Sequence, residues 1–169
     1  MNYLRASAEI SDCGKYRYSL HRAWNDDLPA CLFIMLNPST ADGENDDPTI
    51  RKCVKFAQSW DYGVLDVVNL FAFRATEPAV ILRDGAGDII GPNNDATILH
   101  HAKQADLIVL AWGAHGHHRQ RDEQVEKALR SAGESLHAIA LGDRRKYPRH
   151  PLYLKDCLKP IVYSSPKGQ

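Results

Sequence analysis

The sequence lacks a net charge, a long apolar run and a cysteine framework, and each absence narrows the class of protein. Its 21 basic and 21 acidic residues cancel, so overall charge does not indicate a nucleic-acid partner, and such a claim must depend on a local patch. No apolar run reaches the ~20 residues of a membrane span, and the N-terminus has no signal-peptide core. The four cysteines form no CxxC pair, which predicts reduced thiols in a cytoplasmic protein rather than disulfides.

Motifs for common cofactors are absent too. No GxGxxG or Walker sequence occurs, which argues against dinucleotide and nucleoside-triphosphate chemistry. His115, His117 and His118 are close in sequence, but no cysteine or carboxylate accompanies them at the spacing of a ligand set. We therefore expect neither a metal nor another cofactor.

The chain is organised around the segment 31–36, CLFIML. Six apolar residues with no polar position predict a strand that is buried on both faces. Asn37-Pro38 follows directly, and proline ends the strand because it cannot donate to the ladder. Ligands of open α/β sheets bind at the carboxyl ends of the strands. Asn37 is therefore expected at the edge of the sheet where a site would form.

Strand-like segments alternate with helix-like segments after an N-terminal hairpin, which predicts a mostly parallel sheet covered by helices on both faces. The expected hairpin uses residues 5–11 and 16–22, the strands are 31–36, 64–71, 106–113 and 137–142, and helices begin near Pro48, Pro92, Arg121 and Pro151. We predict one α/β domain over residues 1–169, with a central four-stranded mostly parallel sheet in a three-layer α/β/α arrangement. Residues 1–30 are expected to form a hairpin extension and residues 160–169 a tail.

Polar groups end several of these segments. Asn37, Asn69, Trp112-Gly113 and His150 each have a structural explanation as a turn former, a sheet-edge donor, a core aromatic or a solvated loop histidine. Parallel topology, however, places the ends of the strands at one edge of the sheet. The four polar groups together therefore indicate a site more strongly than any one of them does alone.

The order of segments and four short motifs resemble the uracil-DNA glycosylase superfamily. The motifs are Leu36-Asn37-Pro38-Ser39, the segment 67–76 containing Asn69, Leu110-Ala111-Trp112-Gly113 and His150-Pro151-Leu152. The chain resembles still more closely a bacterial family known as a domain of unknown function, which is spelled around MLNPSTAD and HPLYL. The resemblance implies a uracil-DNA-glycosylase-like fold and an enzyme that flips a nucleotide out of the stack and cleaves its N-glycosidic bond. It would act in base-excision repair or in defence against modified viral DNA.

The resemblance also implies roles for individual residues. Asn37 would position water, and His150 would donate a hydrogen bond to the departing base. Asn69 would read the pyrimidine edge, because its amide offers a donor and an acceptor. Ser39 stands where the uracil-specific branch has a bulky tyrosine, so we expect a pyrimidine with a substituent at C5. The substrate-binding set is Leu36, Pro38, Ser39, Asn69, Phe71, Trp112 and Gly113.

The expected partner is DNA, single-stranded or distorted, bound by a monomer without an iron–sulfur cluster, because the cysteine pattern of the cluster-bearing branches is missing. Since asparagine cannot deprotonate water, Asp42, Asp46 or Asp47 could assist as an acid or base. Basic loops would hold phosphates, and an apolar residue would wedge into the stack. The DNA-binding set is Arg74, His118, Arg119, Arg144, Arg145, Lys146, Arg149, Leu152 and Tyr153.

Two other functions fit the same residues. An enzyme acting on free nucleosides or nucleotides would use the pocket without binding oligonucleotides. A non-catalytic protein that binds a modified base or a small ligand would explain why Asn37 stands where the uracil-specific branch has aspartate. Tight binding without an abasic product would identify that protein.

Overall fold

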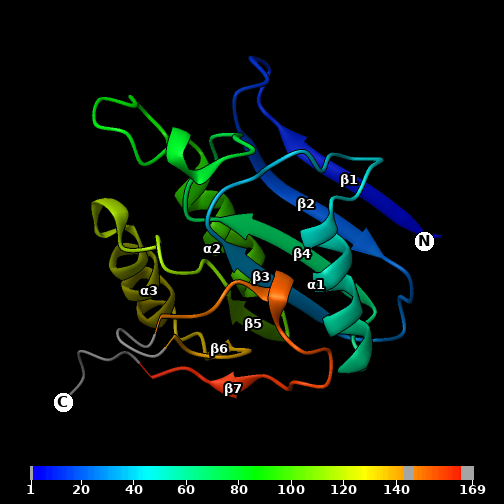
Figure 1. Cartoon of the computed structure of the whole chain (residues 1–169). Helices are drawn as coiled ribbons and strands as arrows, with labels where there is room; N and C mark the ends of the chain where they lie inside the picture. Colours follow the sequence, from blue (N-terminus) through cyan, green and yellow to red (C-terminus); the bar gives the residue numbers. More distant parts are fainter. Residues whose placement is uncertain (1, 143–146, 165–169) are drawn as a thin grey trace.

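The computed structural model describes residues 2–142 and 147–164, which form one seven-stranded mixed sheet with helices on both faces (Figure 1). The strand order is β1-β2-β4-β3-β5-β6-β7. Strands β4, β3, β5 and β6 pair in parallel, whereas β1, β2 and β7 run antiparallel to their neighbours. The strands are β1 Arg5–Ile10, β2 Arg17–Ala23, β3 Ala30–Met35, β4 Val64–Asn69, β5 Leu107–Leu110, β6 Leu136–Ala138 and β7 Ile161–Val162.

The α/β class and the N-terminal hairpin are confirmed, but two details differ from the sequence prediction. The hairpin is an integral edge of the sheet, because β2 pairs with β4 through a register that joins Leu20 to Val67. The expected tail contains β7, which pairs with β6 and adds an antiparallel strand at the other edge. The sheet therefore has antiparallel strands on both sides of its parallel part.

Three α-helices cover the sheet: α1 Pro48–Ser59, α2 Asn94–Gln104 and α3 Arg121–Ser131. Single 3₁₀ turns occur at Pro78–Val80, His118–Gln120 and Pro151–Tyr153. Alternate residues of β3 enter different cores, as the two-residue period of a strand requires. Phe33 packs on the α1 side, while Leu32 and Ile34 pack on the side of α2 and α3. This division explains why the strand has no polar position.

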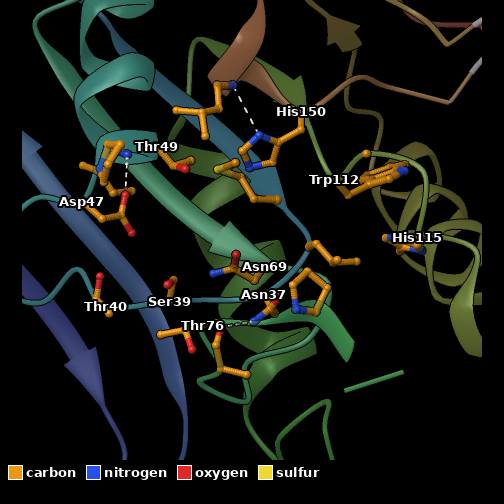
Figure 2. A pocket seen from close by; sticks show the side chains of 18 of the residues that line it. Asn37, Ser39, Thr40, Asp47, Thr49, Asn69, Thr76, Trp112, His115 and His150 are labelled. Carbon is orange, nitrogen blue, oxygen red and sulfur yellow. Dashed lines mark hydrogen bonds between the residues drawn. The ribbon is translucent and has the colours of Figure 1, made fainter. Parts of the chain in front are cut away.

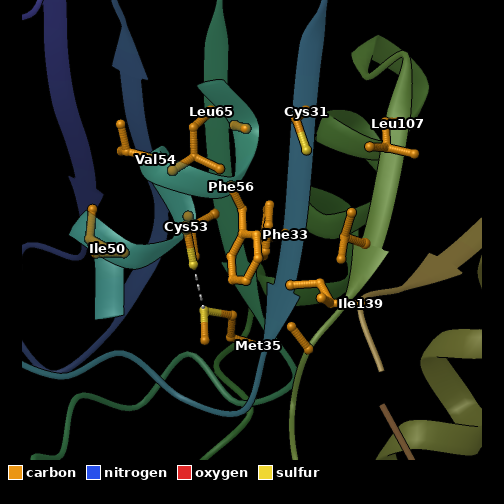
Figure 3. Packing of buried hydrophobic residues seen from close by; sticks show 14 of the residues in the cluster. Cys31, Phe33, Met35, Ile50, Cys53, Val54, Phe56, Leu65, Leu107 and Ile139 are labelled. Carbon is orange, nitrogen blue, oxygen red and sulfur yellow. Dashed lines mark hydrogen bonds between the residues drawn. The ribbon is translucent and has the colours of Figure 1, made fainter. Parts of the chain in front are cut away.

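Helix α1 begins where the sequence predicts it. Asp47 is the N-cap, and its Oδ1 accepts a hydrogen bond of 2.8 Å from the backbone N–H of Ile50, with Pro48 in the first turn. The apolar face of the helix then packs on the sheet, as Figure 3 shows for Cys53 and Met35, whose sulfur atoms lie 3.9 Å apart. The cap thus determines the residue at which α1 begins.

The four cysteines carry free thiols, as predicted: Cys31 and Cys53 are buried, and Cys13 and Cys157 are exposed. Each helix in the described part of the chain is too short or too polar to traverse a lipid bilayer.

Candidate functional site

A cavity of about 640 Å³ opens at the carboxyl ends of the parallel strands. It collects residues from the ends of β3 and β4, from the segment after β5 and from the turn at His150 (Figure 2). The sequence predicts that polar groups at the ends of the strands lie close together, and these groups do line one cavity. The predicted site residues that line the cavity are Leu36, Asn37, Ser39, Asp47, Asn69, Trp112, Gly113, His150, Leu152 and Tyr153.

The orientation of the Asn37 amide is fixed by the backbone around it. Its Nδ2 donates to the carbonyl oxygens of Pro38, at 3.1 Å, and Ala75, at 2.9 Å. Two acceptors on one side leave a single assignment of the amide nitrogen and oxygen. Oδ1 is therefore the atom on the other side of the amide, and it bonds to no described residue. This oxygen can accept a hydrogen bond from a water molecule or a ligand in the cavity.

Asn69, at the end of β4, carries an amide that the protein does not satisfy. The residue is 1% exposed, and its Nδ2 is buried without a hydrogen-bond partner among the described residues. A buried donor of this kind costs roughly 1–3 kcal/mol when it is left unpaired. Asn94 by contrast has a structural use for its Nδ2, which donates to the backbone oxygens of Asn69 and Leu70. The unpaired amide of Asn69 is therefore available for a ligand.

His150 presents a neutral imidazole to the cavity. Its Nδ1 accepts a hydrogen bond of 3.3 Å from the backbone N–H of Leu152. Burial lowers the pKa of His150, although the negative charge of Asp47 opposes that shift. The proton of the neutral ring is thus on Nε2, which lies on the Asn69 side of the ring in Figure 2. His150 can donate one hydrogen bond to a ligand held near Asn69.

The three aspartates considered as auxiliary groups occupy different positions. Asp47 lines the cavity, but its Oδ1 caps α1. Asp42 accepts hydrogen bonds from the backbone of the two residues that follow Gly43, and Asp46 pairs with the buried side chain of Arg22. Neither Asp42 nor Asp46 belongs to the lining of the cavity. Asp47 is therefore the one carboxylate of the three that a ligand in the cavity would meet.

Trp112 and the two glycines near it shape the opposite end of the cavity. Gly113 has a φ of 78°, a left-handed conformation that favours glycine. A Cβ on Gly116 would lie 2.1 Å from the indole Cδ1 of Trp112, so the chain can pass the ring only because this residue is a glycine. His115 lies at the same end of the cavity as Trp112, away from Thr40 and Asp47 (Figure 2).

Other residues assigned to the substrate or to DNA lie elsewhere. Phe71 is fully buried in the core on the side of α2 and α3, where it contacts the ring of His118. Phe71, which the sequence assigns to the substrate, follows the end of β4 at Asn69 and does not belong to the lining of the cavity. Pro38 is buried next to the cavity and does not line it.

The predicted DNA contacts are also divided. Leu152 lines the cavity, and Tyr153 stands at its rim with 87% of its surface exposed. Arg74, His118, Arg119 and Arg149 are outside the cavity lining: Arg74 donates to Gly14, Arg119 donates to Gly87, and Arg149 is exposed. Arg144, Arg145 and Lys146 lie outside the described residues.

Sequence reasoning missed one charged residue of the site. Arg17, from the start of β2, lines the cavity and is only 2% exposed. It was read as part of a peripheral hairpin, whereas the pairing of β2 with β4 carries it to the end of β4. Its backbone N–H donates to the Ala72 oxygen at 2.9 Å. Hydroxyl groups that were also missed line the cavity at Thr40, Thr49 and Thr76.

The histidine-rich loop contains a small cluster that the sequence argument did not anticipate. His117 Nδ1 lies 3.3 Å from an Asp122 oxygen and 3.5 Å from a Glu123 oxygen. The expectation that no carboxylate accompanies these histidines was therefore wrong, because the start of α3 folds back onto the loop. The arrangement brings one imidazole nitrogen within ion-pair distance of two carboxylates at the start of α3. The cluster by itself does not indicate a metal.

Comparison with known proteins identifies a family. A family model matches residues 17–152, and this span includes every cavity-lining residue except Tyr153. The searches of curated proteins and of solved structures found no match. The chain belongs to the family described as "Protein of unknown function (DUF1643)".

Proposed function

We propose that this protein is a DNA glycosylase that excises a modified pyrimidine from a nucleotide flipped into the cavity. The observation that carries the proposal is the unsatisfied amide of Asn69, which is buried in a cavity that also holds Asn37 and a neutral His150. An amide presents a donor and an acceptor side by side, which matches the hydrogen-bonding edge of a pyrimidine. We further propose that β4, β3, β5 and β6, with their helices, form a core like that of the uracil-DNA glycosylase superfamily.

Cleavage of an N-glycosidic bond places positive charge on the sugar and negative charge on the departing base. The Nε2–H of His150 would donate to the base oxygen that gains this charge, a contribution typically worth about 10²–10³ in rate. The free Oδ1 of Asn37 would hold the attacking water in line with the sugar carbon. Because an amide cannot take a proton from that water, Asn37 contributes through position.

The space beside Ser39 supports a substrate with a group at C5. Ser39 is a small, partly buried residue on the wall of the cavity. Ser39 stands at the sequence position where the resemblance implies a bulky tyrosine that would exclude such a group. A modified cytosine is the substrate class that we favour.

One observation favours a second function, a protein that binds a modified base without cleaving it. The amide of Asn37 is held by two backbone oxygens, and Asp47, the one acidic side chain in the described lining, caps a helix. A cavity whose one carboxylate in the described lining caps a helix can recognise a base while leaving its bond intact. The same test separates the two functions.

The test is incubation of the protein with labelled oligonucleotides that carry uracil, mismatched thymine or C5-modified cytosines, single- and double-stranded, followed by alkaline cleavage at abasic sites. Free nucleosides and nucleotides with the same bases are run in parallel. We expect cleavage at a C5-modified base in DNA, and its loss in Asn37→Ala and His150→Ala. Asn93→Ala and His100→Ala, at exposed positions outside the cavity lining, are the matched controls.

Each other outcome has a distinct meaning. Activity on uracil with none on any C5-modified base would refute the substrate class. Binding of a modified oligonucleotide without an abasic product would support the non-catalytic function. Cleavage of free nucleosides with no affinity for oligonucleotides would replace DNA as the substrate.

A further inference from the structure

Three arginines in the described part of the chain are almost fully buried, and only two of them have an acidic partner. Arg22 pairs with Asp46 and Arg121 pairs with Asp95. Arg17, at 2% exposure, forms no ion pair with a described residue. Buried charges in proteins are almost always paired, because an isolated charge loses its hydration without compensation. The missing partner of Arg17 is therefore a feature that requires an explanation.

The hydrogen bonds of Arg17 are incomplete as well. Its Nη1 donates to the Ala41 oxygen at 2.7 Å, whereas its buried Nε has no partner among the described residues. Burial lowers the pKa of Arg17 to about 10, although the Asp47 carboxylate opposes the shift. The guanidinium thus stays protonated at pH 7. It is a fixed positive charge with unused donor capacity on the wall of the cavity.

The surroundings of Arg17 supply further donors. The hydroxyls of Ser39, Thr40 and Thr49 line the cavity and bond to no described residue. The first turn of α1 reaches the same wall through Pro48 to Ile50, and a helix N-terminus carries partial positive charge. Figure 2 shows Ser39, Thr40 and Thr49 on the Asp47 side of Asn69, away from Trp112 and His115.

We propose that the part of the cavity formed by Arg17, Ser39, Thr40 and Thr49 is a phosphate-binding subsite. A guanidinium that can donate through more than one N–H suits a phosphate, whose remaining oxygens can accept from the hydroxyls. The ligand would place its phosphate at this subsite and its ring toward Asn69. That the ring belongs to a pyrimidine nucleotide rests on the function proposed above; the phosphate site itself does not.

Asp47 does not supply the missing partner. Its carboxylate lines the same wall, but it forms no ion pair with Arg17, and its Oδ1 is held by the N–H of Ile50. Charges of both signs act on Arg17: Arg74 and Arg22 lower its pKa, while Asp47 and Asp42 raise it. No carboxylate of the described residues accepts a hydrogen bond from its guanidinium, so its unused N–H groups remain available to a phosphate.

The first experiment uses inorganic phosphate and no DNA. Phosphate is titrated into the protein at constant ionic strength, with chloride as the reference anion, and binding is followed by phosphorus NMR line width and by calorimetry. We expect saturable binding at one site and at least tenfold weaker binding in Arg17→Met. Arg83→Met, which removes the same charge from an exposed residue outside the cavity lining, should bind as the wild type does.

Stability separates a ligand-binding role from a structural one. An unpaired buried cation should be replaceable by methionine without lowering the melting temperature, whereas a structural Arg17 would lower it. If Arg17→Met fails to fold, Thr40→Glu tests the same subsite from an exposed position by placing a carboxylate beside Arg17. Ala114→Glu puts that carboxylate at the Trp112 end of the cavity and should retain phosphate binding. Phosphate affinity that is unchanged in Arg17→Met and Thr40→Glu would overturn the proposal.

Oligonucleotides then identify where the phosphate comes from. If it is a backbone phosphate beside the flipped nucleotide, neutral methylphosphonates at that position will abolish the difference in affinity between the wild type and Arg17→Met. If the phosphate belongs to a substituent on the base, the difference will persist on the neutral backbone and will require a phosphorylated base. Phosphate binding without DNA cleavage would support the phosphate subsite and refute the glycosylase. DNA cleavage without phosphate binding would support the glycosylase and refute the phosphate subsite.

Discussion

Asn69 offers a test of whether its amide is kept for a ligand or for the fold. Replacement by leucine, which has the same branched heavy-atom skeleton, removes a buried donor that has no partner among the described residues. Leaving such a donor unpaired costs roughly 1–3 kcal/mol. Taking the lower end, we expect Asn69→Leu to raise the free energy of unfolding by about 1 kcal/mol. For a chain of this size, that change raises the melting temperature by about 2–4 °C.

Asn94 is the matched control, because it is also a buried asparagine next to the end of β4. Its Nδ2 donates to the backbone oxygens of Asn69 and Leu70 at 2.9 and 3.0 Å. Asn94→Leu removes both bonds, which contribute about 1 kcal/mol each, but it also removes the buried Oδ1, which has no partner among the described residues. We therefore expect it to lower the free energy of unfolding by about 1 kcal/mol. The two substitutions are thus expected to change stability in opposite directions.

Urea denaturation followed by circular dichroism measures both effects, and the oligonucleotide assay measures function. We expect Asn69→Leu to be folded, more stable than the wild type and inactive. This combination is typical of a residue that lowers stability but is needed for function. Loss of more than 1 kcal/mol in Asn69→Leu would refute the reasoning, because it would show that the amide supports the fold.

Three further predictions concern the helix cap, the histidine and the rim. Asp47→Ala should lower the free energy of unfolding by about 1 kcal/mol in urea denaturation, whereas Asp47→Asn should retain most of the cap; equal losses would contradict the capping role. Burial lowers the pKa of His150, so the unfolded state takes up a proton before the folded state does as pH falls below 6.5. The free energy of unfolding should therefore fall below that pH, and it should fall more in the wild type than in His150→Gln. Identical pH profiles of stability would contradict a lowered pKa. Tyr153→Ala, at a side chain 87% exposed, should weaken DNA binding about tenfold with an unchanged melting temperature; unchanged affinity in a binding titration would exclude a wedge role.

Much of the parallel part of the fold was predictable because its signals are local. The apolar segment that ends at Asn37-Pro38 fixed the position of β3, and Asp47-Pro48 fixed the start of α1. Once the strands were parallel, their ends had to meet at one edge of the sheet. That geometric rule predicted that Asn37, Asn69 and His150 lie close to one another, although their contacts could not be predicted.

The features that sequence reasoning missed depend on pairing between distant segments. β7 consists of two exposed residues, Ile161 and Val162, whose strand conformation comes from pairing with β6. β2 reads as a half-exposed strand of a hairpin, yet it lies inside the sheet between β1 and β4, and six of its seven residues are buried. Arg17 was overlooked for this reason, because its burial follows from the pairing with β4.

The charges on the cavity wall connect Arg17 to the chemistry proposed for Asn37. Asp47 is the one acidic side chain in the described lining, while Arg17 remains protonated and His150 neutral. Arg17 favours a departing base anion near it, but it disfavours a sugar that gains positive charge. A phosphate held by Arg17 would supply the negative charge that an aspartate in place of Asn37 would otherwise give. Arg17→Met should therefore lower kcat as well as raise KM, whereas a residue that only anchors the ligand would change KM alone.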